Sequence, residues 1–274
     1  MRLVSVRAAL LLALASAAGP AFSQGQGRSP ERPPGREPLG AYIIQTEEEA
    51  RQMFETDTFE TSAGGLTITF VGHGTLMFAL NGKVIHVDPV SREADYAKMP
   101  KADLILITHD HGDHLDPAAI KAICQPGTAI VAPAKCAPRV VGETVMANGE
   151  AKTVTGLKVE ATPAYNLVHM RSPGQPYHPR GEGNGYVITF GDTRVYVAGD
   201  TENTPEMKGL KNIDIAFLPM NLPYTMTPEM VADAARAFQP KVLYPYHFGQ
   251  TDTAELVKLL ADEPDIEVRV RRLE

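Results

Sequence analysis

The chain is short of cysteine, of positive charge and of long apolar runs, and each shortage excludes a class of protein. Its two cysteines, Cys124 and Cys136, are too few to build a zinc site from cysteine alone. Acidic residues outnumber basic ones by 33 to 26, and the net charge of −7 argues against nucleic acid and anionic membranes as partners. Beyond the N-terminus no segment is apolar enough to span a bilayer, so we expect no stable membrane insertion.

The one long apolar run lies at the N-terminus. Arg2 and Arg7 precede the letters "AALLLALASAA", and "AFS" then offers small residues at the spacing of a cleavage site. We therefore expect residues 1–23 to be a secretory signal peptide, with a retained anchor helix as the alternative, and the mature protein to be periplasmic or secreted. Residues 24–41 are rich in Pro, Gly and charge and predict a flexible leader, which leaves 42–274 as the folded domain. Export would allow a disulfide between Cys124 and Cys136, but their spacing does not decide whether one forms.

The folded part repeats one pattern of elements. Residues 65–90 contain short alternating runs around an Asn-Gly turn, and residues 183–201 repeat this hairpin pattern around a Gly-Asp turn. Residues 102–123 match residues 213–238, since each has a buried strand, a loop, and a helix that begins with proline after an N-cap residue. Two such halves predict an α/β fold with two sheets face to face and helices outside. This is a four-layer αβ/βα sandwich, in which loops of both halves meet at one edge.

The segment "LILITHDHGDHLDPAAI", residues 104–120, places three of the chain's eight histidines within six positions. His109 and His111 are two apart on an extended segment, so their imidazoles can point to the same side. Asp113 and His114 follow at the turn into the predicted helix. Three imidazoles and a carboxylate are ligands that a borderline cation such as Zn²⁺ prefers. The spacing therefore predicts a metal site rather than a solvated polar loop.

The motif "THDHGDH" resembles the signature of the metallo-β-lactamase-fold superfamily, whose fold is the doubled sandwich described above. "YNLVH", "VAGDT" and "YPYHFG" add His169, Asp200 and His247 where further ligands are expected. The resemblance covers residues 65–250 and implies two divalent metal ions bridged by Asp200. The first ion would be held by His109, His111 and His169, and the second by Asp113, His114 and His247. Zn²⁺ is expected first, and the same ligands also accept Mn²⁺, Fe²⁺ or Ni²⁺.

Residues at two positions of the motif differ from those of other members of the superfamily and so exclude two of its groups. Flavodiiron-type members carry glutamate at the position of His111, and true β-lactamases of this fold commonly carry cysteine at that of Asp200, so neither group fits this chain. The strings "TFVGHGTLMF", "VDPV", "NLVH" and "YPYHFG" are together similar to the L-ascorbate-6-phosphate lactonase-like branch, which neighbours the N-acyl-phosphatidylethanolamine phospholipase D group. That resemblance implies that His73, in "GHG", lies near the metal site and lines it.

The implied activity is hydrolysis of a small ester or lactone by a metal-bound hydroxide, because coordination lowers the pKa of water from about 15.7 towards about 7. Asp113 and His73 are the expected catalytic residues, with Asp113 orienting the nucleophile and carrying a proton to the leaving group. A phosphodiesterase of the same fold is one alternative. A metal-binding protein without turnover is the other.

The connection 169–184 is the expected substrate lid, since it is long and rich in Gly, Pro and polar residues. Arg171, His178 and Arg180 within it are candidates to bind a phosphate or carboxylate of a small-molecule substrate, because arginine binds either group with two parallel hydrogen bonds. The alternative is that they are ordinary solvated loop residues.

Overall fold

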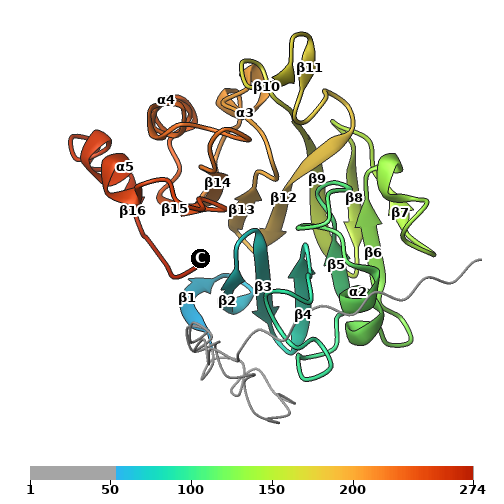
Figure 1. Cartoon of the computed structure of the whole chain (residues 1–274). Helices are drawn as coiled ribbons and strands as arrows, with labels where there is room; N and C mark the ends of the chain where they lie inside the picture. The colour runs from blue at the N-terminus through green and yellow to red at the C-terminus, as the bar shows by residue number, and fades with distance from the viewer. Residues whose placement is uncertain (1–53, 274) are drawn as a thin grey trace, which may run out of the picture. The chain divides into compact units, whose positions relative to one another are not determined.

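The computed structural model describes residues 54–273, which lie within one compact unit, Tyr42–Glu274. The predicted signal peptide and leader lie outside the described residues. The described chain contains two mixed sheets of seven strands each, with helices beside them (Figure 1). None of the helices in this part of the chain has the length and apolar composition needed to cross a bilayer.

The first sheet contains the strands in chain order. They are β1 (Glu55–Thr61), β2 (Gly64–Gly72), β3 (Thr75–Leu80), β4 (Lys83–Val87), β5 (Leu104–Leu106), β6 (Ala129–Ala132) and β7 (Thr144–Val145). Neighbours from β1 to β4 pair antiparallel, and those from β4 to β7 pair parallel. The predicted Asn-Gly turn joins β3 to β4, and the helix α2 (Pro117–Ile123) connects β5 to β6. A short 3₁₀ helix, Ala134–Cys136, follows β6.

The second sheet repeats this plan. It contains β8 (Ala151–Val154), β9 (Leu157–Ala164), β12 (Gly183–Phe190), β13 (Thr193–Val197), β14 (Ile215–Pro219), β15 (Val242–Tyr246) and β16 (Glu267–Val268). The strands from β8 to β13 pair antiparallel, and those from β13 to β16 pair parallel. Helix α4 (Pro228–Phe238) connects β14 to β15 as α2 connects β5 to β6, so the two similar halves predicted from the sequence are confirmed. A separate ribbon of β10 (Met170–Ser172) and β11 (Gln175–Pro176) lies between β9 and β12 in the chain.

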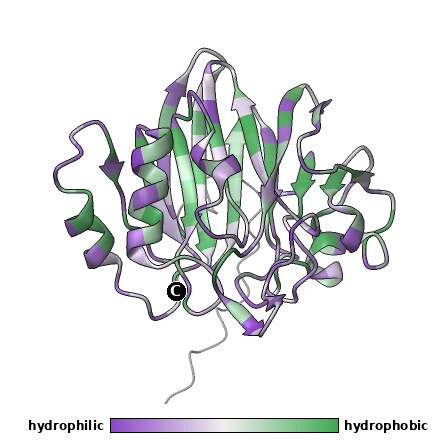
Figure 2. Cartoon of the chain, turned by 90° about the horizontal axis from the view of Figure 1, so that it is seen from above, coloured by the Kyte–Doolittle hydropathy of each residue, from purple (hydrophilic) through white to green (hydrophobic). Residues whose placement is uncertain are grey.

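Three hydrophobic clusters hold the layers together. The central cluster lies between the sheets, where Phe217 of β14 stacks on Tyr244 of β15 with ring centroids 5.0 Å apart and Phe70 of β2 packs on both. A second cluster joins the outer face of the first sheet to α2. A third joins the second sheet to α3 (Pro205–Lys208), α4 and α5 (Thr253–Leu259). In Figure 2 the strands are mainly hydrophobic, whereas the helices also carry hydrophilic stretches. The predicted four-layer sandwich is therefore confirmed.

Local sequence signals set the helix starts. The side chain of Asp116 accepts a hydrogen bond from the N–H of Ala118 at the start of α2, and that of Thr227 accepts from Met230 at the start of α4. Proline occupies the first turn of both helices, as the sequence predicted. Cys124 and Cys136 are free thiols, so no disulfide joins them, and burial raises the pKa of the Cys136 thiol to about 12.

Asp57 of β1 ties the first sheet to the end of the chain. Its carboxylate accepts a hydrogen bond from Arg271 at 2.8 Å and contacts the Tyr244 hydroxyl, and its side chain is 13% exposed. Burial raises the pKa of Asp57, but Tyr244 and Arg271 outweigh it and hold the pKa below 3.8. The folded protein therefore gains stability from the ionised carboxylate.

We expect Asp57→Asn to lower the free energy of unfolding by about 1 to 3 kcal/mol at pH 7. Because the folded pKa of Asp57 lies below its unfolded value, this difference is fully present above pH 3.8 and shrinks as the pH falls through the folded pKa. Urea denaturation at several pH values measures it. Glu267→Gln is the matched control, since Glu267 also pairs with an arginine but is 57% exposed and should change stability by less than about 0.5 kcal/mol. Equal effects of the two variants at pH 7 would contradict the role of Asp57.

Candidate metal centre

Several strands of both sheets end at one edge of the sandwich, and polar residues follow these strand ends. β2 is followed by His73, β4 by Asp88, β5 by the loop of His109 to His114, β13 by Asp200 and β15 by His247. Together with His178, several of these side chains form three groups. Within each group the possible ligand atoms lie within 4.8 Å of one another. The structure thus brings together residues from both halves of the chain, as the sequence predicted for this edge.

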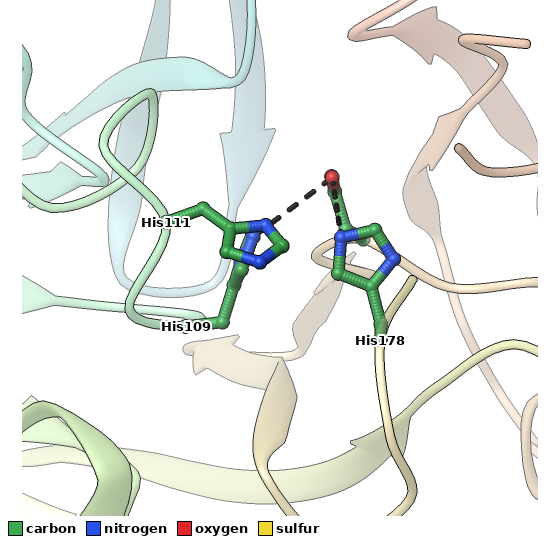
Figure 3. Close-up of side chains that lie close together, drawn as sticks. His109, His111 and His178 are labelled. Carbon is green, nitrogen blue, oxygen red and sulfur yellow. Dashed lines mark ion pairs between the residues drawn. The ribbon is translucent and has the colours of Figure 1, made fainter. Parts of the chain in front are cut away.

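The first group consists of His109, His111, His178 and Asp200. The side chains of His109 and His111 come from the loop after β5 and face that of His178, which comes from the other side (Figure 3). The Oδ2 atom of Asp200 lies 3.2 Å from Nε2 of His178 and 3.9 Å from Nε2 of His109. Three imidazoles and one carboxylate oxygen therefore surround one small volume.

The second side of Asp200 faces a different pair of imidazoles. Its Oδ1 atom lies 3.4 Å from Nε2 of His114 and 3.5 Å from Nε2 of His247. Asp113 adjoins this group, with Oδ2 at 3.7 Å from Nε2 of His247 and 3.4 Å from Nε2 of His73. The two oxygens of Asp200 thus point to two separate sets of ligand atoms, which is the geometry of a bridging carboxylate.

Unpartnered polar atoms show that these residues suit metal ions. The Nε2 atoms of His109, His114 and His247 and the Oδ1 atom of Asp200 are buried and have no hydrogen-bond partner among the described residues. Leaving buried polar atoms unpaired costs about 1 to 3 kcal/mol each. Cations bound in the two groups would satisfy all four atoms, and imidazole with carboxylate is a donor set that zinc and similar ions accept.

Charges and burial in the cluster favour the protonation states that metal binding needs at Asp200 and His109. Burial raises the pKa of Asp200, but the nearby imidazoles of His247 and His114 outweigh it and hold the pKa well below 3.8. Burial lowers the pKa of His109 well below 6.5, and the charge on His114 lowers it further. The Asp200 carboxylate is therefore ionised and His109 is neutral, which are the states that a metal ligand needs.

Asp88 orients one imidazole of the cluster. It is fully buried, and its Oδ2 atom lies 2.7 Å from Nδ1 of His114 while Thr108 donates to both carboxylate oxygens. Because Nδ1 of His114 is held by Asp88, its Nε2 atom faces Asp200. Burial lowers the pKa of His114, but Asp200 and Asp88 outweigh it and raise the pKa to about 9 in the metal-free protein.

Backbone strain is concentrated at the site. His73, Asp88 and His247 have φ of 49°, 47° and 45°, in the left-handed region that non-glycine residues rarely adopt. The N–H of His247 donates to the carbonyl of His73 at 3.1 Å, and the two rings lie 3.8 Å apart. A Cβ atom at Gly74 would lie 2.7 Å from the ring of His114, so only glycine fits there. Strained residues that the fold holds in place are typical of functional sites.

The structure corrects the placement of His169. This residue belongs to none of the three groups of ligand atoms, and its Nδ1 atom lies 2.7 Å from the carboxylate of Glu202. The ribbon β10–β11 follows and returns the chain to the site at His178, which was expected to bind substrate. His178 therefore takes the place of His169 in the candidate ligand set.

Two residues without a sequence signal position His178. Asn166 accepts hydrogen bonds from the N–H of His178 at 2.7 Å and from its Nδ1 at 2.9 Å, which leaves Nε2 facing Asp200. Glu202 is fully buried, and its Oε1 atom accepts a hydrogen bond from Nδ2 of Asn166 at 3.1 Å. It also accepts hydrogen bonds from three consecutive N–H groups, those of Leu167, Val168 and His169. The loop after β9 is therefore fixed by one carboxylate.

An open cleft of about 460 Å³ leads to the cluster, a size that suits a small molecule. Its outer wall contains Arg92, Arg171, Tyr177, Asn221 and Tyr224. The predicted substrate residue Arg171 thus lines the cleft, and its guanidinium lies over the ring of Tyr177 at 5.7 Å. Arg180 does not line it, because its side chain pairs with Glu206 and lies over Tyr165. No sequence pattern pointed to Arg92 or the two tyrosines as residues of the cleft.

Comparisons with known proteins agree with this architecture. A family model described as "Beta-lactamase superfamily domain" matches residues 67–247. A UPF0173 metal-dependent hydrolase of Thermococcus onnurineus is 32% identical over 217 residues, which is 73% of this chain and 94% of that protein. One from Methanopyrus kandleri is 32% identical over 67% of this chain and 84% of its own length.

Solved structures give the same result. A protein of Parabacteroides distasonis named as a metal-dependent hydrolase has 52% sequence identity and a TM-score of 0.77, and the match covers 81% of this chain and all of that one. Igni18, a metallo hydrolase of Ignicoccus hospitalis, has 25% identity and a TM-score of 0.62 over 76% of this chain and 95% of its own. The resemblance to the lactonase-like branch stays a prediction. With the family model spanning most of the described residues, this chain belongs to the β-lactamase superfamily and has the metallo-β-lactamase fold.

Proposed function

We propose that this protein is exported and hydrolyses a small ester or lactone with the help of two divalent metal ions. It is a metal-dependent hydrolase of the metallo-β-lactamase fold, as its relatives are named. The observation that carries the two-ion proposal is Asp200, whose two oxygens face two different groups of imidazoles. A single-ion site would need only one of these groups.

The ligand set follows from the distances. His109, His111 and His178 would hold one ion, Asp113, His114 and His247 the other, and Asp200 would bridge them. Zn²⁺ suits these ligands first, and Mn²⁺, Fe²⁺ or Ni²⁺ are the alternatives. When bound, such ions lower the pKa of coordinated water and polarise the substrate's carbonyl or phosphoryl oxygen.

The chain's own residues orient the reactants. The carboxylate of Asp113 is 35% exposed in the cleft, where it can accept a proton from the attacking water and pass it to the leaving group. His73 lies 3.4 Å from the same carboxylate and restricts its rotation. Arg171, held over Tyr177, faces the cleft and would bind an anionic group of the substrate.

A phosphodiesterase is the second candidate. Arg92 and Arg171 on the cleft wall favour it, because guanidinium groups bind phosphate oxygens well. The acidic chain, at a net charge of −7, favours a small molecule over a nucleic acid as the substrate. Cleavage of model compounds separates the two candidates.

One preparation tests export, metal content and activity. Full-length protein is recovered from the periplasm without chelator and its mass is measured, with cleavage after Ser23 as the expected result. Plasma mass spectrometry should then find two equivalents of a transition metal per chain. The protein should hydrolyse p-nitrophenyl acetate or γ-butyrolactone but not bis(p-nitrophenyl) phosphate. This activity should disappear with a chelator and return with Zn²⁺ or Mn²⁺.

Other outcomes overturn parts of the proposal. Less than about 0.1 equivalent of metal, even after incubation with Zn²⁺ or Mn²⁺, would contradict the metal centre. Faster cleavage of the phosphodiester would favour the second candidate. Two tightly held equivalents without any product would favour a metal-binding protein without turnover. An unprocessed mass in the cytoplasmic fraction would contradict export.

A further inference from the structure

Exposed hydrophobic side chains gather beside the cleft. Nine large hydrophobic residues are exposed in the part of the chain that the structure describes, and five of them lie on two short segments, 167–170 and 222–224. These five form what we call the apolar rim: Leu167, Val168, Met170, Leu222 and Tyr224. Single exposed hydrophobic residues need no explanation, but a group of them next to a site marks a binding surface.

Hydrogen bonds hold the two segments of the rim together. The Asn166 side chain donates to the carbonyl of Tyr224 at 2.8 Å, which joins the loop after β9 to the loop after β14. Glu202 accepts from the N–H groups of Leu167 and Val168 at 2.6 and 2.7 Å, so the backbone of these two exposed residues is held by the buried carboxylate. The apolar groups are thus presented by a fixed backbone and need no rearrangement to bind.

The rim continues into the cleft through Tyr224. Tyr224 is 44% exposed and also lines the cleft, where its ring meets that of Tyr177 edge-on at 5.0 Å. Tyr177 in turn lies beside His178 of the candidate metal centre. An extended molecule with one end at the metal centre would therefore meet the two tyrosines first and the rim next.

We propose that the apolar rim binds the aliphatic chain of the substrate, so that the protein prefers esters or lactones with a long aliphatic chain over those with a short one. The inference rests on the proposed function and names its substrate class. Five side chains are too few for a stable protein interface, which buries about 800 Å² on each partner. The acidic chain also disfavours an anionic bilayer as the occupant. Continuity with the cleft favours the substrate itself.

The chain-length dependence of hydrolysis tests this. A methylene group that leaves water improves binding up to about fourfold, so kcat/KM of the metal-loaded protein should rise at least about tenfold from p-nitrophenyl acetate to p-nitrophenyl octanoate. The double variant Val168→Ser/Leu222→Ser should lower the octanoate to acetate ratio by at least about fivefold. Val141→Ser is the matched control, since Val141 is 95% exposed outside the rim. It should keep the wild-type ratio.

Binding of octanoate and acetate by calorimetry gives a readout without turnover. Octanoate should bind at least about tenfold more tightly than acetate to the wild type, and the double variant should lose the difference. If no ester is hydrolysed but this difference is present, the proposed function fails and the rim still binds chains. A flat chain-length profile in active protein, or equal ratios in the double variant and the control, overturns the inference alone. Binding of the wild-type protein to phosphatidylcholine vesicles, if the double variant loses it, also overturns the inference, because the rim would then contact a lipid surface.

Discussion

Asp200→Ala should lower kcat/KM by at least about a thousandfold and reduce the bound metal from two equivalents to one or fewer. The expected loss is large because the carboxylate faces both groups of imidazoles and no other anion lies between them among the described ligands. Without this carboxylate, no negative charge between the two groups would offset the repulsion between two bound cations. Metal content by mass spectrometry and ester hydrolysis at saturating Zn²⁺ measure the two effects.

The Asp200 variant needs controls for folding and for charge. Asp192→Ala is matched, because Asp192 lies in the exposed turn before the same strand, β13, and should retain metal and activity. Asp200→Asn keeps the shape and removes the charge, so it should lose nearly as much activity as the alanine variant. The circular dichroism spectrum should stay that of the wild type in all three. Two equivalents of metal and full activity in Asp200→Ala would exclude a bridging role.

The fold could be predicted because its signals are local and repeated. The Asn-Gly turn at Asn81 specified the β3–β4 hairpin, and Asp116-Pro117 and Thr227-Pro228 specified where α2 and α4 begin. The repeat then required two similar sheets. Asp88 follows the hairpin of the first half as Asp200 follows that of the second half, and both carboxylates lie at the same edge. Their roles differ, since Asp88 is enclosed by Thr108 and His114 whereas Asp200 faces unpartnered imidazole nitrogens.

The site could be predicted only where its residues are neighbours in sequence. The loop from His109 to His114 needs one turn of backbone to bring its side chains together. The choice between His169 and His178 depends on how the ribbon β10–β11 folds back, which spacing does not reveal. Glu202 follows Asp200 and Thr201 in a polar stretch typical of a surface loop, yet it is fully buried. Its role depends on the N–H groups of a loop more than thirty residues away.

Asp88→Ala is the second variant with a large expected effect, in this case on stability. The substitution leaves the Thr108 N–H, the Thr108 hydroxyl and Nδ1 of His114 without their acceptor inside the protein. Breaking such a buried charged network costs about 3 to 5 kcal/mol. Alanine is also less tolerant than aspartate of the φ of 47° at this position. Urea denaturation of the metal-free protein measures the loss. Asp103→Ala is the control, because the Asp103 side chain accepts one hydrogen bond, from the N–H of Val84, and should cost only about 1 kcal/mol.

Asp88→Asn separates metal affinity from stability. Asparagine keeps the volume and tolerates the positive φ, but it offers a weaker acceptor to Nδ1 of His114. The imidazole is then less firmly oriented towards Asp200, and Zn²⁺ affinity should fall about 10- to 100-fold, as is typical when the partner of a ligating histidine is changed. Competition with a chromophoric chelator measures this, and Asp103→Asn should bind Zn²⁺ as the wild type does. If Asp88→Asn also binds Zn²⁺ as tightly as the wild type, His114 either is not a ligand or is oriented by other contacts.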